Sequence, residues 1–224
     1  MIEMADVHVR FGQRDVLRGI TLSLPERRVG VIGANGSGKS TLARLINGLA
    51  LPSSGGVTVL GLDTGRHAAR IRRRVGFLFS DPDAQIVMPT VAEDVAFSLR
   101  RKGLSSGEID RRVRDVLTRY GLAEHADHPA HHLSGGQKQL LALCSIMVLE
   151  PDILVMDEPT TLLDLRHSRQ VADVLRELPQ QVVVVSHDLG LLAGFDRVLV
   201  LDEGRIVADA EPGAAIDHYR KIMS

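Results

Sequence analysis

The chain of 224 residues is long enough to bury a sizeable core without disulfides, as one large domain. Its formal net charge of −1 gives no bulk attraction to nucleic acid or to an anionic membrane, and only 3% of its residues are aromatic. The first residues, Met1–Asp6, include acids and lack an apolar core, and no apolar run approaches the ~20 residues of a membrane span. We therefore expect no secretory signal, no membrane span and no nucleic-acid partner.

The N-terminal residues 2–24 alternate polar and apolar side chains in short runs, with Gly12 and Gly19 at turn positions. This period of two predicts an antiparallel β layer. Phe11 lies in this layer, and two interpretations of it stay open. It is either a core side chain or a ring that stacks on an adenine base.

A glycine-rich loop follows, between a predicted buried strand at 29–32 and a predicted helix at 42–49. Residues 33–41 match the phosphate-loop pattern G-x-x-x-x-G-K-[ST]. In this pattern backbone N–H groups and the helix N-terminus surround nucleotide phosphates, the lysine reaches the β- and γ-phosphates, and the hydroxyl after it binds Mg²⁺. We therefore expect ATP and Mg²⁺ as ligands, with nucleotide contacts from Gly33, Asn35, Gly36, Ser37, Gly38, Lys39, Ser40 and Thr41 and a metal contact from Ser40.

Further strands are predicted at 57–61 and 75–79, after which residues 80 to about 149 become mostly helical. Ser105 and Glu108 form a capping-box pattern ahead of a helix that stops at Gly121. The run 140–149 is apolar nearly all round, which indicates a buried helix and makes its cysteine, Cys144, a buried hydrophobe rather than a reactive thiol. These segments predict a helical lobe inserted into an α/β core.

The core resumes with strands at 153–158 and 181–186, a helix at 165–178 and a hairpin around the turn 202–204. The expected fold class is α/β, a phosphate-loop NTPase with a mainly parallel core sheet, the N-terminal antiparallel layer and the inserted helical lobe at about 80–149.

Acidic and histidine side chains lie at the carboxyl ends of the predicted core strands. Ligands of an open parallel sheet bind at the carboxyl ends of its strands. Asp157 ends one strand and is placed to hold Mg²⁺, and Glu158 beside it would orient or deprotonate the attacking water. His187 ends the next strand, where it would stabilise the γ-phosphate. We assign catalysis to Glu158 and His187 and a second metal contact to Asp157.

A second phosphate-binding candidate is the sequence Leu133-Ser134-Gly135-Gly136-Gln137, in which a serine and two glycines open a helix. Free N–H groups and the positive dipole end of that helix suit anionic oxygens. We add its polar members to the nucleotide-binding set: Ser134, Gly135, Gly136 and Gln137.

With these motifs in place, the chain resembles the nucleotide-binding subunit of ATP-binding cassette (ABC) transporters over essentially its whole length. The resemblance implies one ABC ATPase domain, 1–224, whose copies close head to tail so that each ATP lies between one phosphate loop and the partner's signature at 133–137. It also matches Asp164 to the segment that communicates across that dimer interface.

In a narrower resemblance, residues 81–85 and 89–97 are similar to the ATPases of energy-coupling factor (ECF) importers of vitamins and transition-metal ions. It implies a homodimer or a pair of different ATPases, a transmembrane coupling protein, a substrate-capturing membrane protein and a peripheral place on the cytoplasmic side of the cell membrane. Residues 160–166 resemble the biotin-uptake branch, with cobalt, nickel or another vitamin as alternatives. A soluble ABC ATPase without a transport role and a non-hydrolysing regulatory module are the other classes.

Two features depart from the family pattern. Ser80 stands where the family usually has a glutamine, which puts the relay to the membrane partner in doubt, and Gln85 is too far along the chain to be assumed a substitute. Residues 162–164 lack the small residues usual before the aspartate. Separately, the histidines at 125, 128, 131 and 132 form either a solvated loop or, by composition alone, a metal site.

Overall fold

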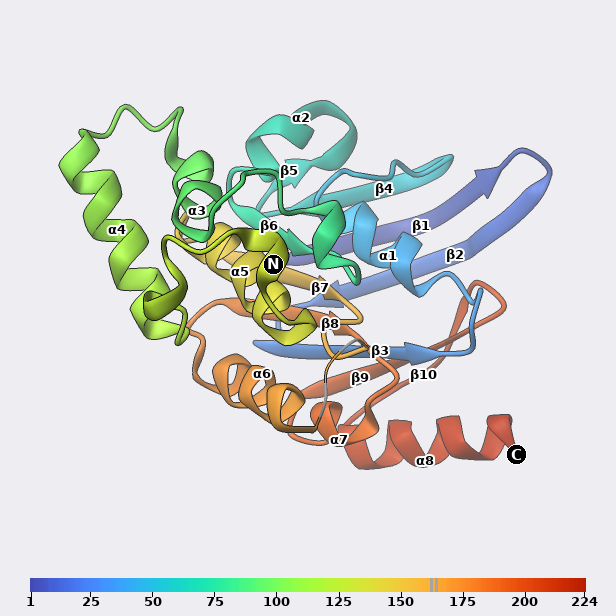
Figure 1. Cartoon of the computed structure of the whole chain (residues 1–224). Helices are drawn as coiled ribbons and strands as arrows, with labels where there is room; N and C mark the ends of the chain where they lie inside the picture. The colour runs from blue at the N-terminus through green and yellow to red at the C-terminus, as the bar shows by residue number, and fades with distance from the viewer. Residues whose placement is uncertain (162, 164) are drawn as a thin grey trace. The chain divides into compact units, whose positions relative to one another are not determined.

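The computed structural model describes residues 1–161, 163 and 165–224 (Figure 1). Its contacts divide these residues into two compact units. The first unit comprises Met1–Phe77, Asp152–Glu158 and Leu178–Ser224. The second comprises Leu78–Pro151 and Pro159–Glu177. The segment expected to form a helical lobe falls in the second unit, together with the later residues 159–177.

The first unit contains the antiparallel sheet predicted at the N-terminus. Its strand order is β2-β1-β4-β5, with β1 at Ile2–Phe11, β2 at Arg14–Leu24, β4 at Ser54–Val59 and β5 at Leu62–Asp63. Ile2 pairs with Leu24 and Met4 with Leu22, and all four side chains are buried. The alternation of the sequence therefore gives one buried face, as a half-buried strand requires.

The second sheet of this unit is the predicted α/β core, in the order β10-β9-β3-β8-β7-β6. Its strands are β3 (Arg28–Gly33), β6 (Val75–Leu78), β7 (Ile153–Asp157), β8 (Gln181–Val185), β9 (Arg197–Asp202) and β10 (Arg205–Ala210). β3, β7, β8 and β9 run parallel, and β10 returns antiparallel to β9. Every residue of β3 and β7 is buried, which agrees with the apolar runs at 29–32 and 153–156 and includes the charged residues Arg28 and Asp157.

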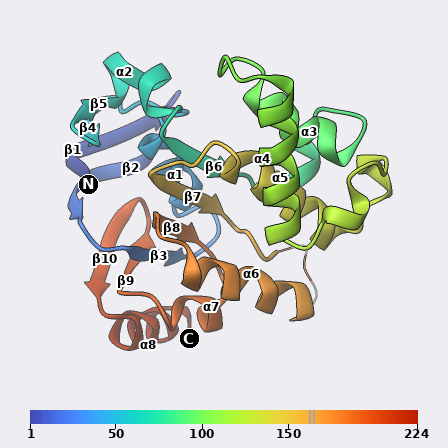
Figure 2. The same cartoon turned by 90° about the vertical axis from the view of Figure 1, so that its left-hand side faces the viewer.

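Four helices belong to the first unit: α1 (Lys39–Ile46), α2 (Thr64–Ile71), α7 (Leu189–Leu192) and α8 (Pro212–Met223). α1 contacts strands of both sheets, and α8 packs on β9 and β10 (Figure 2). Leu42, Leu45 and Ile46 of α1 are buried. The helix that follows the glycine-rich loop is thus fixed from two sides.

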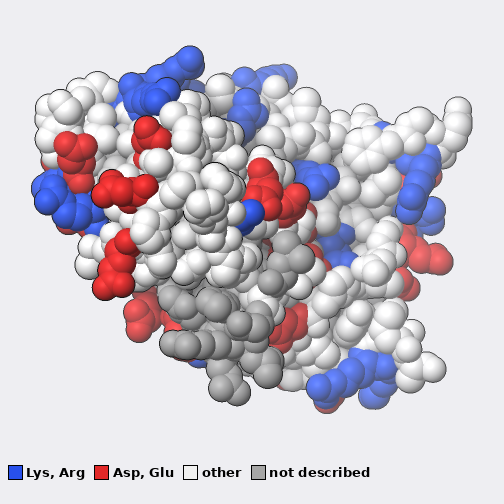
Figure 3. Space-filling view, viewed as in Figure 1, with Lys and Arg blue, Asp and Glu red and all other residues white. Residues whose placement is uncertain are grey.

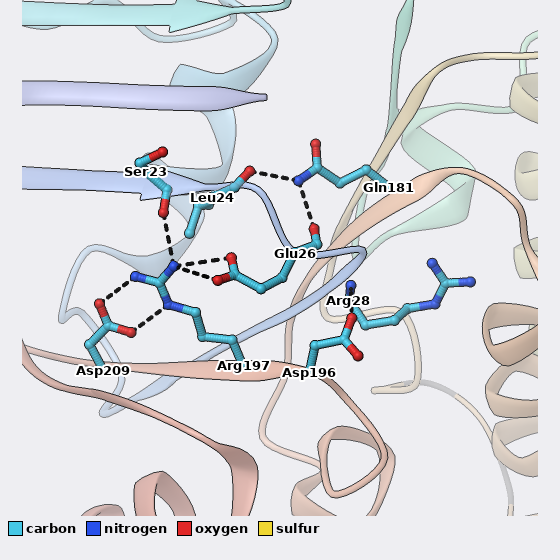
Figure 4. A network of polar contacts seen from close by, with 8 residues as sticks. All are labelled: Ser23, Leu24, Glu26, Arg28, Gln181, Asp196, Arg197 and Asp209. Carbon is cyan, nitrogen blue, oxygen red and sulfur yellow. Dashed lines mark hydrogen bonds and ion pairs between the residues drawn. The ribbon is translucent and has the colours of Figure 1, made fainter.

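A polar network connects residues at the amino ends of three core strands, β3, β8 and β9 (Figure 4). Arg197 at the start of β9 makes two 2.6 Å hydrogen bonds to Asp209 and reaches Glu26 at 3.0 Å. Both carboxylates hold the pKa of Arg197 above its ordinary value. Gln181 at the start of β8 donates to the carbonyls of Leu24 and Glu26, both at 2.8 Å. The amino edge of the sheet is therefore structural, which leaves the carboxyl edge for ligands.

The second unit is helical, with α3 (Val91–Leu99), α4 (Ser106–Arg119), α5 (Gly135–Met147), α6 (Leu165–Glu177) and three 3₁₀ turns, η1 (Pro82–Ala84), η2 (Ala123–His125) and η3 (Ala130–His132). α5 contacts α3, α4 and α6, and its residues 139–147 are buried. In the described part of the chain no helix combines the length and apolarity needed to cross a bilayer.

The capping box predicted at Ser105 is only half formed. Ser105 Oγ accepts the N–H of Glu108 at 3.3 Å, but the Glu108 carboxylate takes hydrogen bonds from Arg111 and Arg112 instead of turning back to the cap. The two arginines lie three and four residues on, on the same helix face, and outcompete the backbone. Basic and acidic side chains lie side by side on the surface over α4, as Figure 3 shows.

Candidate functional site

The glycine-rich loop turns from the end of β3 into α1 through a left-handed glycine. Gly38 is the N-cap of α1 with φ 106°, and a Cβ there would lie 2.8 Å from both Leu17 Cδ2 and the carbonyl oxygen of Val16. Any other residue would clash with β2 at this point. The loop sequence and the packing of the N-terminal sheet therefore depend on each other.

Lys39 is folded into the loop rather than extended into solvent. It is 6% exposed, and its Nζ donates to the carbonyls of Gly33 at 2.8 Å and Ala34 at 2.9 Å. Burial lowers the pKa of Lys39, and the carboxylates of Glu158 and Asp157 oppose that shift. A third ammonium hydrogen stays available for an anion.

The loop offers backbone donors as well. The Ser37 N–H donates to Ala34 O at 3.2 Å, and the Leu42 N–H to Gly38 O at 2.9 Å. Among the described residues nothing accepts the N–H groups of Gly36, Gly38 or Lys39. Unpaired amides at a helix N-terminus, beside a buried ammonium, suit the oxygens of a polyphosphate. Of the remaining expected members, Asn35 is exposed and Thr41 is half-buried in the first turn of α1.

Ser40 and Asp157 meet at the carboxyl edge of the core sheet. The Ser40 hydroxyl donates to Asp157 Oδ1 at 2.9 Å, and Asp157 is 3% exposed. Arg44, one turn further along α1, lies 3.9 Å from the other carboxylate oxygen. Hydroxyl and carboxylate oxygens are the ligands that Mg²⁺ prefers, so the pair fits the expected metal. Arg44 is a neighbour that the sequence patterns did not indicate.

Glu158 and His187 are likewise brought together. His187 Nε2 lies 3.1 Å from Glu158 Oε1, and the His187 N–H donates to Oε2 at 3.2 Å. Glu158 has a left-handed backbone, with φ 53°, and its N–H donates to Val185 O at 2.8 Å. This strained conformation turns the carboxylate toward the end of β8, where His187 follows. The Glu158 side chain is 16% exposed and that of His187 46%.

Phe11 ends β1 with 59% of its surface exposed. It is therefore not the core side chain that one interpretation allowed, and a ring is available at the surface of the first unit. Arg14, on the other side of the same hairpin turn, reaches the loop, because a Cβ at Gly36 would lie 3.5 Å from Arg14 Nη2. Nothing in the spacing of the sequence indicated this second cation beside the loop.

The signature residues open α5 in the second unit. Ser134 is the N-cap, and together with Gln137 it forms a complete capping box. Ser134 and Gly135 are exposed, Gly136 is buried, and the side chain of Gln137 is engaged with its own helix. The exposed helix start keeps its free N–H groups available to an anion.

The four histidines ahead of the signature pair off as 125 with 128 and 131 with 132. The described residues contain no group of three or more His, Cys, Asp or Glu side chains placed to hold a metal ion. Gln85 Oε1 accepts the N–H of Phe79 at 3.3 Å, so that side chain is already used next to Ser80. Cys144 is fully buried and burial raises its thiol pKa, as expected of a hydrophobe.

Asp164, the remaining residue expected to contact nucleotide, lies outside the described residues, and so does Leu162.

Comparison with known proteins gives the family. A family model described as ABC transporter matches residues 17–161. A protein of Deinococcus radiodurans, provisionally named an ABC transporter ATP-binding protein, is 53% identical over 100% of this chain and 99% of its own length. The biotin transport ATP-binding protein BioM of Rhizobium etli is 48% identical over 100% of this chain and 99% of its own length.

A solved structure gives the same result for the fold. CbiO1 of Clostridium perfringens, described as part of the ABC transporter complex CbiONQ, has a TM-score of 0.86 at 30% identity and covers 99% of this chain and 92% of its own. This chain belongs to the ABC transporter family. It is an ABC ATPase, the ATP-binding subunit of a transporter.

Proposed function

We propose that this chain energises biotin uptake as the ATPase of an ECF-type importer. The observation that carries the proposal is the 48% identity to a biotin transport ATP-binding protein over the full length of both chains. A second BioM, from Rhodobacter capsulatus, is 42% identical over 99% of this chain. The membrane partners would be a transmembrane coupling protein and a substrate-capturing protein, with the ATPase, one domain of residues 1–224, attached peripherally at the cytoplasmic side.

In this proposal the first unit binds MgATP. The free N–H groups of the loop and Lys39 take the phosphates, while Phe11 stacks on the adenine. Ser40 and Asp157 hold Mg²⁺, which would neutralise phosphate charge as the bond to the γ-phosphate breaks. The short Ser40–Asp157 distance and the buried carboxylate support this role.

Glu158 acts as the general base. Its carboxylate is held 3.1 Å from His187 Nε2, which fixes the orientation in which it can accept a proton from water. His187 keeps Glu158 in place and presents its ring to the γ-phosphate. The left-handed backbone at Glu158 supports a functional role, because such conformations persist where surrounding structure enforces them.

The signature acts in trans. Ser134, Gly135 and Gly136 of one copy would bind the γ-phosphate held by the phosphate loop of a second copy, with Asp164 at the same interface. A cassette structure, MJ0796, described as a dimeric post-hydrolysis state bound to ADP and Pi, is 27% identical with a TM-score of 0.84. Because ATP would contact both copies only when they are closed, its binding favours the closed dimer and hydrolysis releases it.

The test is uptake in cells that lack the chromosomal copy of this gene and carry a plasmid copy instead. The unaltered chain is expected to restore uptake of labelled biotin, whereas Lys39→Ala, which loses the phosphate contact, and Glu158→Gln, which loses the base, are not. Biotin uptake at the unaltered rate with either variant would contradict the proposal.

Cobalt or nickel uptake is the second candidate, because residues 81–85 and 89–97 resemble the ATPases of importers that take up vitamins and transition-metal ions. The same cells distinguish the two. Uptake of labelled Co²⁺ or Ni²⁺ that depends on Glu158, with no change in biotin uptake, would replace the first proposal by the second.

A further inference from the structure

The side-chain amide of Gln137 lies between the start of the signature helix and a histidine. Gln137 Oε1 accepts the Ser134 N–H at 2.9 Å, and its Nε2 lies 2.9 Å from His125 Nε2. A backbone N–H can only donate, so the amide oxygen must face Ser134. The amide nitrogen must therefore donate to His125.

This direction fixes the protonation of two imidazoles. His125 Nε2 accepts, so the ring is neutral and carries its hydrogen on Nδ1. That Nδ1 lies 2.9 Å from His128 Nδ1, which must then accept in turn. Both rings are neutral, and the hydrogen bonds run in one direction from Ser134 through Gln137 and His125 to His128.

The loop that carries His125 and His128 is held in place by hydrogen bonds that do not involve α5. The His128 N–H donates to His125 O at 2.9 Å, closing the turn that holds both rings. The start of α3 fixes the same loop, because the N–H groups of Val91 and Ala92 donate to His128 O at 3.2 Å and Ala126 O at 2.9 Å. His125 is half-buried there. It is thus a fixed acceptor against which the Gln137 amide is held.

We propose that His125 is a positioning residue for the signature. By accepting from Gln137 it keeps the amide oxygen on the Ser134 N–H and so keeps the capping box closed. The closed cap holds Ser134 and Gly135 in the conformation in which they meet the nucleotide of a second copy, and in that respect the inference rests on the proposed function.

Other charged groups near the loop do not replace this role. On the elements bonded to it, Glu93 is held by Thr90, Asp94 by Val87, Met88 and Ser145, and Lys138 by Asp83. The loop itself carries four more titratable side chains, and all of them are exposed: Glu124, Asp127, His131 and His132. Among the described residues only His125 contacts the Gln137 amide nitrogen.

The experiment compares three variants in a Glu158→Gln background, where ATP is bound without turnover. His125→Phe removes the acceptor, and His125→Gln keeps an acceptor that cannot be protonated. His132→Phe is the matched control, because His132 is an exposed loop histidine whose ring contacts His131 and not Gln137. The readouts are the dissociation constant of the ATP-bound dimer and nucleotide affinity of the single subunit.

The expected result is a dimer dissociation constant raised about fivefold or more in His125→Phe, the scale of one lost hydrogen bond, with single-subunit affinity unchanged. His132→Phe and His125→Gln stay at the parent value near neutral pH. Equal dimerisation of His125→Phe and parent, or a dimer weakened as much in His125→Gln as in His125→Phe, would overturn the inference.

Histidine tautomers provide a readout that does not need the dimer. Nitrogen NMR of the isolated full chain is expected to show His125 with hydrogen on Nδ1 and His128 with hydrogen on Nε2. A hydrogen on His125 Nε2 overturns the inference. If the parent never pairs with ATP, the proposed function fails, and the tautomer alone then decides on the bond to Gln137.

Discussion

The Ser40 hydroxyl donates to Asp157 Oδ1 at 2.9 Å, although 117 residues separate the two in the chain. One stands at the start of the helix that follows β3, and the other at the end of β7, two strands away in the sheet. The parallel order of the sheet brings a hydroxyl and a buried carboxylate to one edge, where together they form a site for a hard divalent cation.

Asp157→Asn is expected to raise the Mg²⁺ concentration needed for half-maximal ATP hydrolysis by about 10- to 100-fold, because the amide carries no charge for the cation. The side-chain amide still has an oxygen that can accept the hydrogen bond of the Ser40 hydroxyl, so we expect the fold to be retained. Titration of hydrolysis with Mg²⁺ measures the change, and nucleotide binding in the presence of a chelator serves as the control. An unchanged Mg²⁺ requirement would remove Asp157 from the metal site.

Glu158→Gln is expected to bind MgATP like the unaltered chain and to lose at least about a hundredfold in turnover, the scale of a general base. The amide keeps the size of the side chain and a hydrogen bond to the His187 N–H, but it accepts no proton from water. Single-turnover hydrolysis measures the chemical step. Turnover within a few-fold of the unaltered chain would mean that another group activates the water.

The phosphate loop and the acid pair are predictable from sequence because each is carried by adjacent residues with a strand or helix beside them. Arg44 and the Arg197 network are not, because their partners are distant in the chain; Arg197 and Glu26 are 171 residues apart. The error at Ser105 has a different cause. The motif predicted Glu108 as a cap, but two arginines one turn further on compete for the same carboxylate.

Arg197→Met is expected to lower the free energy of unfolding by about 1–3 kcal/mol without changing ATP turnover per folded molecule. It leaves Asp209 and Glu26 without their cation, and the cost stays below that of a fully buried pair because both carboxylates are partly solvated. Denaturant unfolding measures it. Arg220→Met, which removes an exposed pair with Asp217, is the matched control and should cost under about 0.5 kcal/mol. Equal losses in the two variants would contradict the structural role of the network.

Glu108 gives a pH dependence of stability with a definite sign. Hydrogen bonds from Arg111 and then Arg112 lower its pKa from 4.5 to about 2. A carboxyl whose folded pKa is depressed stabilises the fold above its unfolded pKa, and the contribution is lost as pH falls from 4.5 toward 2. Glu108→Gln should therefore be less stable than the unaltered chain near neutral pH, and the difference should shrink in that acid window.

Urea unfolding at a series of pH values measures this difference. Asp110→Asn on the same helix is the control, because the described residues show no ion pair to its carboxylate. A gap between Glu108→Gln and the unaltered chain that stays constant down to about pH 3 would contradict the assignment.

In the proposed function ATP is bound by two copies at once, between the loop of one and the signature of the other. Light scattering of Glu158→Gln at saturating MgATP tests it most directly. We expect a dimer that forms with MgATP, is lost with ADP and is lost when the Ser134 cap is replaced in Ser134→Arg. A Glu158→Gln chain that binds MgATP and stays monomeric at every protein concentration would contradict it.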